Sequence, residues 1–458
     1  MLAPKRSRKK AAPVTIPPCH SILLGQNHEK PSLGFGKASA PEASAGEAVN
    51  YTGGGHLCTV APTRSGKGVG VIIPNLLTYT GPVIVFDPKG ENYNVTARRR
   101  REMGHRVIKL DPFGVTEGAS DSLNPFDLLD LPAAGDVDSN AQTLAELLAT
   151  GIRGHREPFW DISGTAFASG LVAMAATQGN AAQRNLNHVV EKLTAGDAVH
   201  GLAVILDTIG KKICKLAYRE IACVLQMPDV TRGGVLATTQ SYFKPFLNDC
   251  VASCLEKSSF SLKDVVDGAP LSIYIILPPN RMRSHRGLLK LWVGTLMAAI
   301  FTRQSRPEAK TLFLLDEVAQ LESFPLLESL LTLAGGYSVW VHTIWQDLAQ
   351  LKTCYPDSWK TILNNCGVIQ AFGFNNRDMA TQWGDYFDHG PHQLRAMKPG
   401  EQILSIQGQG EAICERLNYL SDPQFAGKFD ANLMHTPKGR RPRLPEPPPE
   451  SGPSSPSL

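Results

Sequence analysis

Short runs of apolar, β-branched residues, each bounded by turn residues, constrain the fold of this chain more than any other feature. Three of them lie at residues 56–61 (HLCTVA), 81–88 (GPVIVFDP) and 105–113 (HRVIKLDPF). Strands buried on both faces have this texture, because helices cover both sides of a parallel sheet. A helical pattern at residues 91–103 separates the second run from the third. This alternation predicts an α/β fold with a mainly parallel sheet.

The strand pattern stops after Pro125 and resumes near residue 271. In the interval, apolar residues recur at helical spacing, and we predict an inserted all-α domain at residues 131–249. Four more strand-like runs follow, at residues 271–277 (LSIYIIL), 311–317 (TLFLLDE), 338–344 (SVWVHTI) and 367–373 (GVIQAFG). The domain that carries the sheet is therefore predicted to comprise residues 51–130 and 250–435.

Both ends of the chain differ from the rest in composition. Residues 1–50 are rich in Pro, Gly, Ala and Ser, and we predict an irregular N-terminal arm. Its basic cluster at residues 5–10 (KRSRKK) can contact nucleic acid or anionic lipid, or can simply be solvated. Residues 436–458 form a Pro-rich basic tail, which we predict to be disordered because it cannot bury a core.

Composition and charge exclude several classes of protein. No apolar run reaches the roughly 18–20 residues that a membrane-spanning helix needs, and prolines follow the basic cluster where a secretory signal would be apolar. The 9 cysteines include no CxxC pair, which argues against a zinc site or a disulfide framework and fits a reducing cytosol. A net charge of +4 permits contact with nucleic acid without arguing for it.

The segment APTRSGKG at residues 61–68 lies between a predicted strand and an apolar helix, as a phosphate-binding loop does. Backbone N–H groups of small residues can converge on an anion there, and Lys67 would neutralise the β- and γ-phosphates. The match to G-x-x-x-x-G-K-[ST] is incomplete, because Ala61 replaces the first glycine and Gly68 replaces the magnesium-binding hydroxyl residue. The predicted nucleotide contacts are Pro62, Thr63, Arg64, Ser65, Gly66, Lys67, Gly68 and Val69.

Two further sites are suggested by polar residues at strand ends. The strand at residues 311–317 ends in Asp316 and Glu317. Asp316 would hold Mg²⁺, directly or through water, and Glu317 would orient or deprotonate the attacking water. Gln346, just after the strand at residues 338–344, can sense the γ-phosphate or can simply begin a helix. Each signal is weak alone, but together with the phosphate loop they predict nucleotide hydrolysis.

Five motifs, in this order, resemble the type IV secretion coupling proteins, the TraG/VirD-like ATPases of bacterial conjugation. They are residues 61–77 (APTRSGKGVGVIIPNLL), 87–91 (DPKGE), 123–129 (LNPFDLL), 314–321 (LLDEVAQL) and 344–352 (IWQDLAQLK). The resemblance extends from about Leu23 to Leu420 and implies a RecA-like nucleotide-binding domain with an inserted all-α domain. It also implies a hexameric ring that uses ATP and Mg²⁺ to pass a relaxase-bound DNA strand, or a protein effector, to a secretion channel.

By this resemblance Lys67 is the Walker A lysine, Asp316 and Glu317 are the Walker B pair, and Gln346 is the sensor. The magnesium-binding hydroxyl would come from Thr63, from Ser65 or from water.

The sequence departs from the family in two ways. Members usually begin with transmembrane helices, which this sequence lacks, so we expect a cytoplasmic protein that docks at the inner membrane through partners. No Lys or Arg lies between Glu317 and Gln346, where relatives often place the arginine that acts on a neighbour's phosphoryl group. Arg377 is the first candidate for this role and Arg232 the second, and a plain surface arginine is the alternative for both.

Three functions remain open from the sequence. The leading one is an ATP-driven motor and receptor that contacts single-stranded DNA through its phosphates, without base specificity. The second is a nucleotide-binding adaptor that recruits a relaxase or effector through the helical domain and hydrolyses little. The missing arginine and membrane anchor favour this adaptor. The third is a soluble DNA translocase that works away from any secretion channel.

Overall fold

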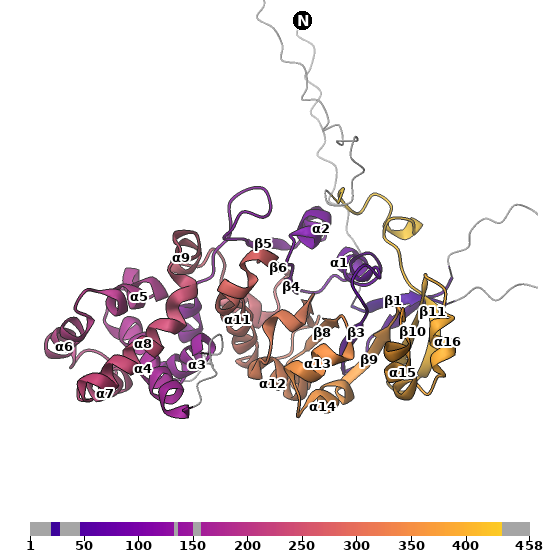
Figure 1. Ribbon diagram of the computed structural model, residues 1–458. Helices are drawn as coiled ribbons and strands as arrows, with labels where there is room; N and C mark the ends of the chain where they lie inside the picture. Colours follow the sequence, from indigo (N-terminus) through magenta and orange to yellow (C-terminus); the bar gives the residue numbers. More distant parts are fainter. Residues whose placement is uncertain (1–19, 28–45, 132–135, 150–156, 433–458) are drawn as a thin grey trace, which may run out of the picture.

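The computed structural model describes residues 20–27, 46–131, 136–149 and 157–432 (Figure 1). The strands are β1 (Ile22–Gln26), β2 (Ala48–Tyr51), β3 (His56–Val60), β4 (Val83–Phe86), β5 (Arg106–Leu110), β6 (Leu271–Ile275), β7 (Thr311–Leu315), β8 (Val339–Trp345), β9 (Cys366–Ala371), β10 (Glu401–Ile406) and β11 (Gly410–Glu415). They form one 11-stranded sheet in the order β2-β1-β11-β10-β9-β3-β8-β7-β4-β6-β5. The basic cluster at residues 5–10 and the tail at 436–458 lie outside the described residues.

The central part of the sheet is parallel. The strands from β9 through β3 to β5 all run in the same direction, whereas β10, β11, β1 and β2 pair antiparallel. The predicted α/β class with a mainly parallel sheet is confirmed. Alternate residues of β4 enter different cores: Ile84 and Phe86 pack in one apolar cluster, Val83 and Val85 in another. Because both faces are covered, the strand is apolar throughout.

Helices cover the two faces of the parallel sheet (Figure 1). On one face lie α1 (Ile73–Thr78) and α2 (Glu91–Glu102), and on the other α12 (Pro325–Leu333), α13 (Leu348–Cys354) and α14 (Trp359–Asn364). The long helix α11 (Pro279–Phe301) is kinked at His285, whose φ of −122° and ψ of 21° are not helical. The helices α15 (Arg377–Tyr386) and α16 (Pro391–Arg395) lie beside the antiparallel strands β10 and β11.

From Pro125 to Asp267, the described residues between β5 and β6 form helices joined by turns and short loops. The helices are α3 (Val137–Ala149), α4 (Pro158–Thr177), α5 (Leu186–Thr194), α6 (Ala198–Ile209), α7 (Lys215–Leu225), α8 (Asp229–Phe243), α9 (Asp249–Glu256) and α10 (Leu262–Asp267). Helices α3 to α9 gather at one side of the sheet (Figure 1). Leu147 of α3 packs against Gly294 of α11, so an apolar contact joins this group to the rest. We propose that these helices correspond to the inserted domain predicted at residues 131–249.

The prediction of an irregular arm at residues 1–50 is wrong where the structure describes that segment. β1 pairs with β2 and with β11, and Ile22 to Leu24 are buried. Asn75 of α1 holds β1 in place: the Leu23 N–H donates to Asn75 Oδ1 at 2.8 Å, and Asn75 Nδ2 donates to the Leu23 carbonyl at 2.9 Å. The sequence pattern missed β1 because five residues carry little periodicity and the pairing partner β11 is far away in the chain.

A buried hydrogen-bond chain fixes β3, the strand that leads into the phosphate loop. Thr59 of β3 bonds to His342 Nε2 of β8 at 2.7 Å and donates to Gln370 Oε1 of β9 at 2.7 Å. Gln370 Nε2 in turn donates to Gln402 Oε1 of β10. Buried polar groups joined in this way resist rearrangement, because a change in one strand leaves partners in the next unpaired.

Arg100 of α2 is fully buried, and its guanidinium donates to the carbonyls of Tyr79 and Gly81 and to Ser272 Oγ. We expect Arg100→Met to lower the free energy of unfolding by about 3 kcal/mol or more, because each buried acceptor left unpaired costs about 1–3 kcal/mol. Urea denaturation measures this change. The exposed neighbour provides a control, since Arg101→Met should change stability by less than about 0.5 kcal/mol. Equal stability of the two variants would contradict the assigned role.

Candidate functional site

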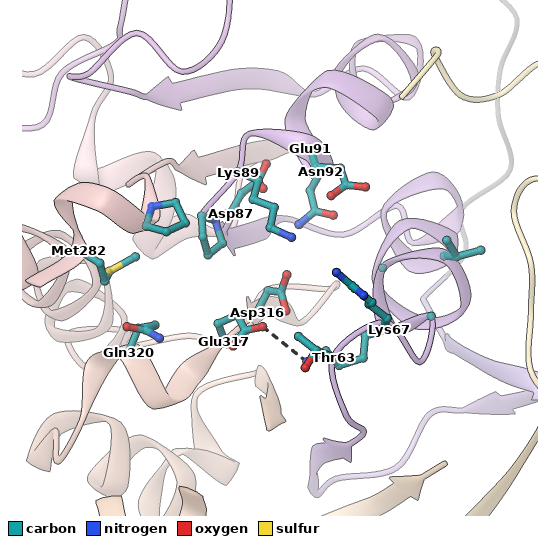
Figure 2. Close-up of a pocket in the computed structure, with 16 residues that line it drawn as sticks. Thr63, Lys67, Asp87, Lys89, Glu91, Asn92, Met282, Asp316, Glu317 and Gln320 are labelled. Atoms are coloured by element: carbon teal, nitrogen blue, oxygen red, sulfur yellow. Dashed lines mark ion pairs between the residues drawn. The ribbon is translucent and has the colours of Figure 1, made fainter. Parts of the chain in front are cut away.

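A cavity of about 620 Å³ opens at the carboxyl ends of β3, β4 and β7 (Figure 2). The phosphate loop forms one wall, and the turn between β4 and α2 forms the opposite wall. The end of β7 and the start of α11 contribute the rest. Parallel strands bring their carboxyl ends to the same edge of the sheet, which is where ligands bind in open α/β sheets.

Most of the predicted nucleotide contacts line this cavity. They are Thr63, Arg64, Gly66, Lys67, Gly68 and Val69. Pro62 and Ser65 shape the loop instead, since Ser65 Oγ donates to the Pro62 carbonyl at 2.6 Å. Ser65 does not line the cavity, which leaves Thr63 or water as the magnesium ligand. Gly66 has a φ of 94°, in the left-handed region that favours glycine.

Lys67 lies at the centre of the loop with its side chain buried. Its ammonium is 3.6 Å from Glu317 Oε1, and no residue in the described part of the chain forms a hydrogen bond with it. A buried ammonium without hydrogen-bond acceptors is costly. Phosphate oxygens would supply those acceptors, so the site fits an anion.

Two carboxyl groups face the cavity from adjacent strands. Burial, reinforced by the negative charge of Glu317, raises the pKa of Asp316 to about 6. Burial also raises the pKa of Asp87, which is 1 % exposed, to about 7, and the charge of Asp316 adds to this effect. A bound cation would stabilise both carboxylates, and carboxylate oxygen is a ligand that Mg²⁺ prefers.

Across the described residues, no group of three or more His, Cys, Asp or Glu side chains is arranged to hold a metal by itself. A magnesium ion at Asp316 would therefore take most of its ligands from water and phosphate, as Mg²⁺ does in nucleotide sites.

Glu317 is held between two other predicted site residues. Its backbone adopts φ 57° and ψ 45°, an uncommon conformation for a residue other than glycine. Gln346 Nε2, at the end of β8, donates to Glu317 Oε2 at 2.7 Å, and Lys67 lies on the other carboxylate oxygen. The structure thus brings together Lys67, Glu317 and Gln346 from three distant parts of the sequence. Strained backbone of this kind is concentrated at functional sites.

The two arginine candidates lie in different surroundings. Arg377 is exposed at the start of α15 and does not line the cavity, although the preceding loop touches the phosphate loop at Gly373. Arg232 donates to the carbonyls of Leu225 and Met227, at 3.1 Å each, within the helical part of the chain. These contacts give Arg232 a structural explanation and leave Arg377 as the stronger candidate.

No role was predicted from the sequence for the turn between β4 and α2. Asp87, Lys89, Glu91 and Asn92 all line the cavity from this turn (Figure 2). A signal was present in the sequence, because the motif DPKGE directly follows a buried strand. In a parallel sheet, the end of a strand that neighbours the Asp316 strand reaches the same edge as Asp316. Arg416, after β11, was also missed. Its guanidinium donates to the Ser65 carbonyl behind the phosphate loop and stacks on Phe372 at 4.4 Å, and no local pattern reveals this.

The raised pKa values of Asp87 and Asp316 predict how the stability of the nucleotide-free protein depends on pH. In the unfolded chain both groups lose their proton near pH 3.8, but in the folded protein they keep it to about pH 7 and about pH 6. The folded state therefore binds more protons in this window, and the unfolding free energy contributed by these groups falls as pH rises through it.

We expect Asp87→Asn to reduce the loss of thermal stability between about pH 5 and pH 7, measured as the denaturation midpoint. Asp385→Asn changes an exposed carboxylate and should leave the pH dependence as it is. An unchanged slope in Asp87→Asn would show that Asp87 does not carry the buried proton.

The strand order, the loop after β3 and the acidic pair after β7 define a RecA-like P-loop nucleotide-binding fold. The chain belongs to the family described as type IV secretory system conjugative DNA transfer, whose model matches residues 23–383. In the part of the chain that the structure describes, no helix has both the length and the apolarity needed to cross a bilayer.

Curated relatives agree with this family. The chain is 26% identical to a conjugal transfer protein TraG of Escherichia coli over 360 residues, which cover 72% of this chain and 54% of that protein. It is also 26% identical to the VirD4 protein of Rhizobium radiobacter over 429 residues, covering 84% of this chain and 59% of that one. The chain therefore spans only a little over half the length of these relatives.

Among solved structures, the fold resembles that of the bacterial conjugative coupling protein TrwB. The unbound form superposes with a TM-score of 0.61 at 15% identity, covering 79% of this chain and 84% of that chain. TrwB in complex with ADP and Mg²⁺ gives the same TM-score and identity, with coverage of 79% and 85%. At this level of identity the similarity establishes the fold alone.

Proposed function

We propose that this chain binds and hydrolyses ATP as the motor part of a type IV coupling protein. It recruits a relaxase–DNA complex or a protein effector to a secretion channel and helps to drive the transfer. The observation that carries the proposal is that Lys67 and Glu317 meet at one cavity, with Gln346 bonded to Glu317. The buried Lys67 ammonium there has no hydrogen-bond partner among the described residues. Family membership and the ADP–Mg²⁺ complex of TrwB support it.

Each residue has a role that follows from its position. Lys67 binds the β- and γ-phosphates, and Glu317 orients the attacking water and accepts its proton. Gln346 fixes the Glu317 carboxylate through the bond at 2.7 Å. Asp316 would hold Mg²⁺, with the Asp87 carboxylate beside it and the Thr63 hydroxyl as a further ligand. The bound ion would neutralise phosphate charge.

The partners follow from the family and from the chemistry of DNA. We propose that the chain assembles as a homo-oligomer, a hexameric ring on DNA or on its partners, and binds single-stranded DNA without sequence preference. Its other partners are a relaxase or effector and components of the channel. It would act in the cytoplasm, where ATP is available, and at the inner membrane through these partners.

ATP turnover measured with and without single-stranded DNA tests this function. We expect turnover that rises on adding DNA, with DNA binding that weakens steeply as salt increases, because phosphate contacts release counterions. ATP binding without turnover under either condition would contradict the motor and favour the adaptor. The adaptor is supported by one observation, the absence of any Lys or Arg between Glu317 and Gln346.

A further inference from the structure

Lys89 is a second lysine on the cavity, and it stands on the wall opposite the phosphate loop. Figure 2 shows its side chain extending from the turn between β4 and α2 toward the space above Asp316. The side chain is exposed, and in the described part of the chain no carboxylate or other acceptor forms an ion pair or hydrogen bond with its ammonium. The charge is therefore free to meet a ligand.

The backbone of this turn is fixed. The Gly90 N–H donates to the Asp87 carbonyl at 3.3 Å, and the Tyr93 N–H donates to Asp87 Oδ2 at 2.9 Å. Gly90 has a φ of 66°, and a Cβ there would lie 2.4 Å from Thr116 Cγ2, so no larger residue fits without a shift. Because β4 pairs with β7, the turn that bears Lys89 keeps a constant position relative to Asp316.

The charges of Lys67 and Lys89 both act on the carboxyl group of Asp316. The positive charges of Lys67 and Lys89 both favour the ionised form of Asp316 and act to lower its pKa, against the larger effect of burial. A phosphoryl group bound between Lys67 and Asp316 would therefore also lie in the field of Lys89. Arg64 is the remaining cation on the cavity within the described chain, and it belongs to the phosphate loop, on the same wall as Lys67.

We propose that Lys89 contacts the γ-phosphoryl oxygens of ATP from the wall opposite Lys67 and stabilises their charge during transfer, within the same subunit. The inference rests on the proposed ATPase function. In the step, the water oxygen bonds to the γ-phosphorus as the bond to the β–γ bridging oxygen breaks. ADP leaves with that electron pair, and the water proton passes to Glu317. Lys89 thereby supplies a positive charge to the phosphoryl group. The segment between Glu317 and Gln346 cannot supply it, because that segment contains no Lys or Arg.

Calorimetry with Mg²⁺-ATPγS and with Mg²⁺-ADP tests this contact without relying on turnover. We expect Lys89→Met to weaken ATPγS binding about tenfold or more and ADP binding no more than about twofold, because a charge-assisted contact to the γ-phosphate is lost. Turnover should fall about 100-fold or more, as when one charge-stabilising donor is removed. Lys89→Arg should retain most of both, and Lys263→Met, at an exposed lysine of α10, should match the wild type.

The outcomes separate this inference from the function it rests on. A wild-type protein that binds neither nucleotide would overturn both. A wild-type protein that binds and hydrolyses ATP, with an unchanged preference for ATPγS over ADP in Lys89→Met, would overturn only the role of Lys89. Mixing Lys89→Met with Lys67→Ala subunits should restore no activity, because no single site then holds both lysines. Restored activity would show that Lys89 acts at the site of a neighbouring subunit, which would contradict its assignment within one subunit.

Discussion

Glu317→Gln is expected to bind ATP and to lose hydrolysis. The amide has the shape of the carboxylate but cannot accept the proton of the attacking water, and loss of such a base typically costs about 10²–10⁴-fold in rate. Binding should persist, because Lys67 makes the main contact with the phosphates. The substitution also removes the carboxylate that lies 3.6 Å from the Lys67 ammonium. Phosphate release measures turnover, and calorimetry with ATP measures binding.

The exposed Glu308 offers a matched control, since Glu308→Gln removes the same charge away from the cavity and should leave turnover unchanged. Turnover in Glu317→Gln close to that of the control would exclude Glu317 as the residue that activates water.

Arg377→Ala is expected to bind ATP normally and to lose turnover in the assembled protein. Arg377 is exposed beside the loop that contacts the phosphate loop, so a neighbouring subunit could receive it at its own cavity. An arginine acting across such an interface is worth about 10³–10⁵-fold in rate. In this arrangement Arg377 and Lys89 approach the phosphoryl group from different subunits.

Mixing experiments distinguish the two cations. Arg377→Ala combined with Lys67→Ala should recover part of the activity, because some interfaces then pair an intact phosphate loop with an intact arginine. The same mixture made with Lys89→Met should not recover. Full activity of Arg377→Ala alone would exclude Arg377 and leave Lys89 or a partner protein as the source of the charge.

The central part of the sheet was predictable from the sequence because its strands are buried on both faces. A run such as VIVF in β4 is apolar at every position, so burial alone marks it. β11 was not predictable in the same way, because four of its first five residues face solvent and its pattern resembles a loop. β1 and β2 depend on pairing with each other and with β11, and a local pattern carries no information about such distant partners.

The site was predictable where residue type and spacing carry chemistry. Lys67, Glu317 and Gln346 were each placed at a strand end by the sequence, and the parallel arrangement makes those ends meet. Asp87 and Lys89 follow the same rule, but a lone carboxylate or lysine in a turn is usually solvated and gave no reason to assign a role. Arg416 could not be found, because its contact with Ser65 depends on how β11 packs behind the loop.

The central claim is that the cavity between β3, β4 and β7 is an ATP site centred on Lys67. Calorimetry of Mg²⁺-ATPγS binding to the full chain, compared with Lys67→Ala, tests it most directly. We predict one site per chain in the wild type and no measurable binding in the variant, because the backbone of the loop alone cannot offset the charge of the phosphates. Equal affinity in the two proteins would contradict the account.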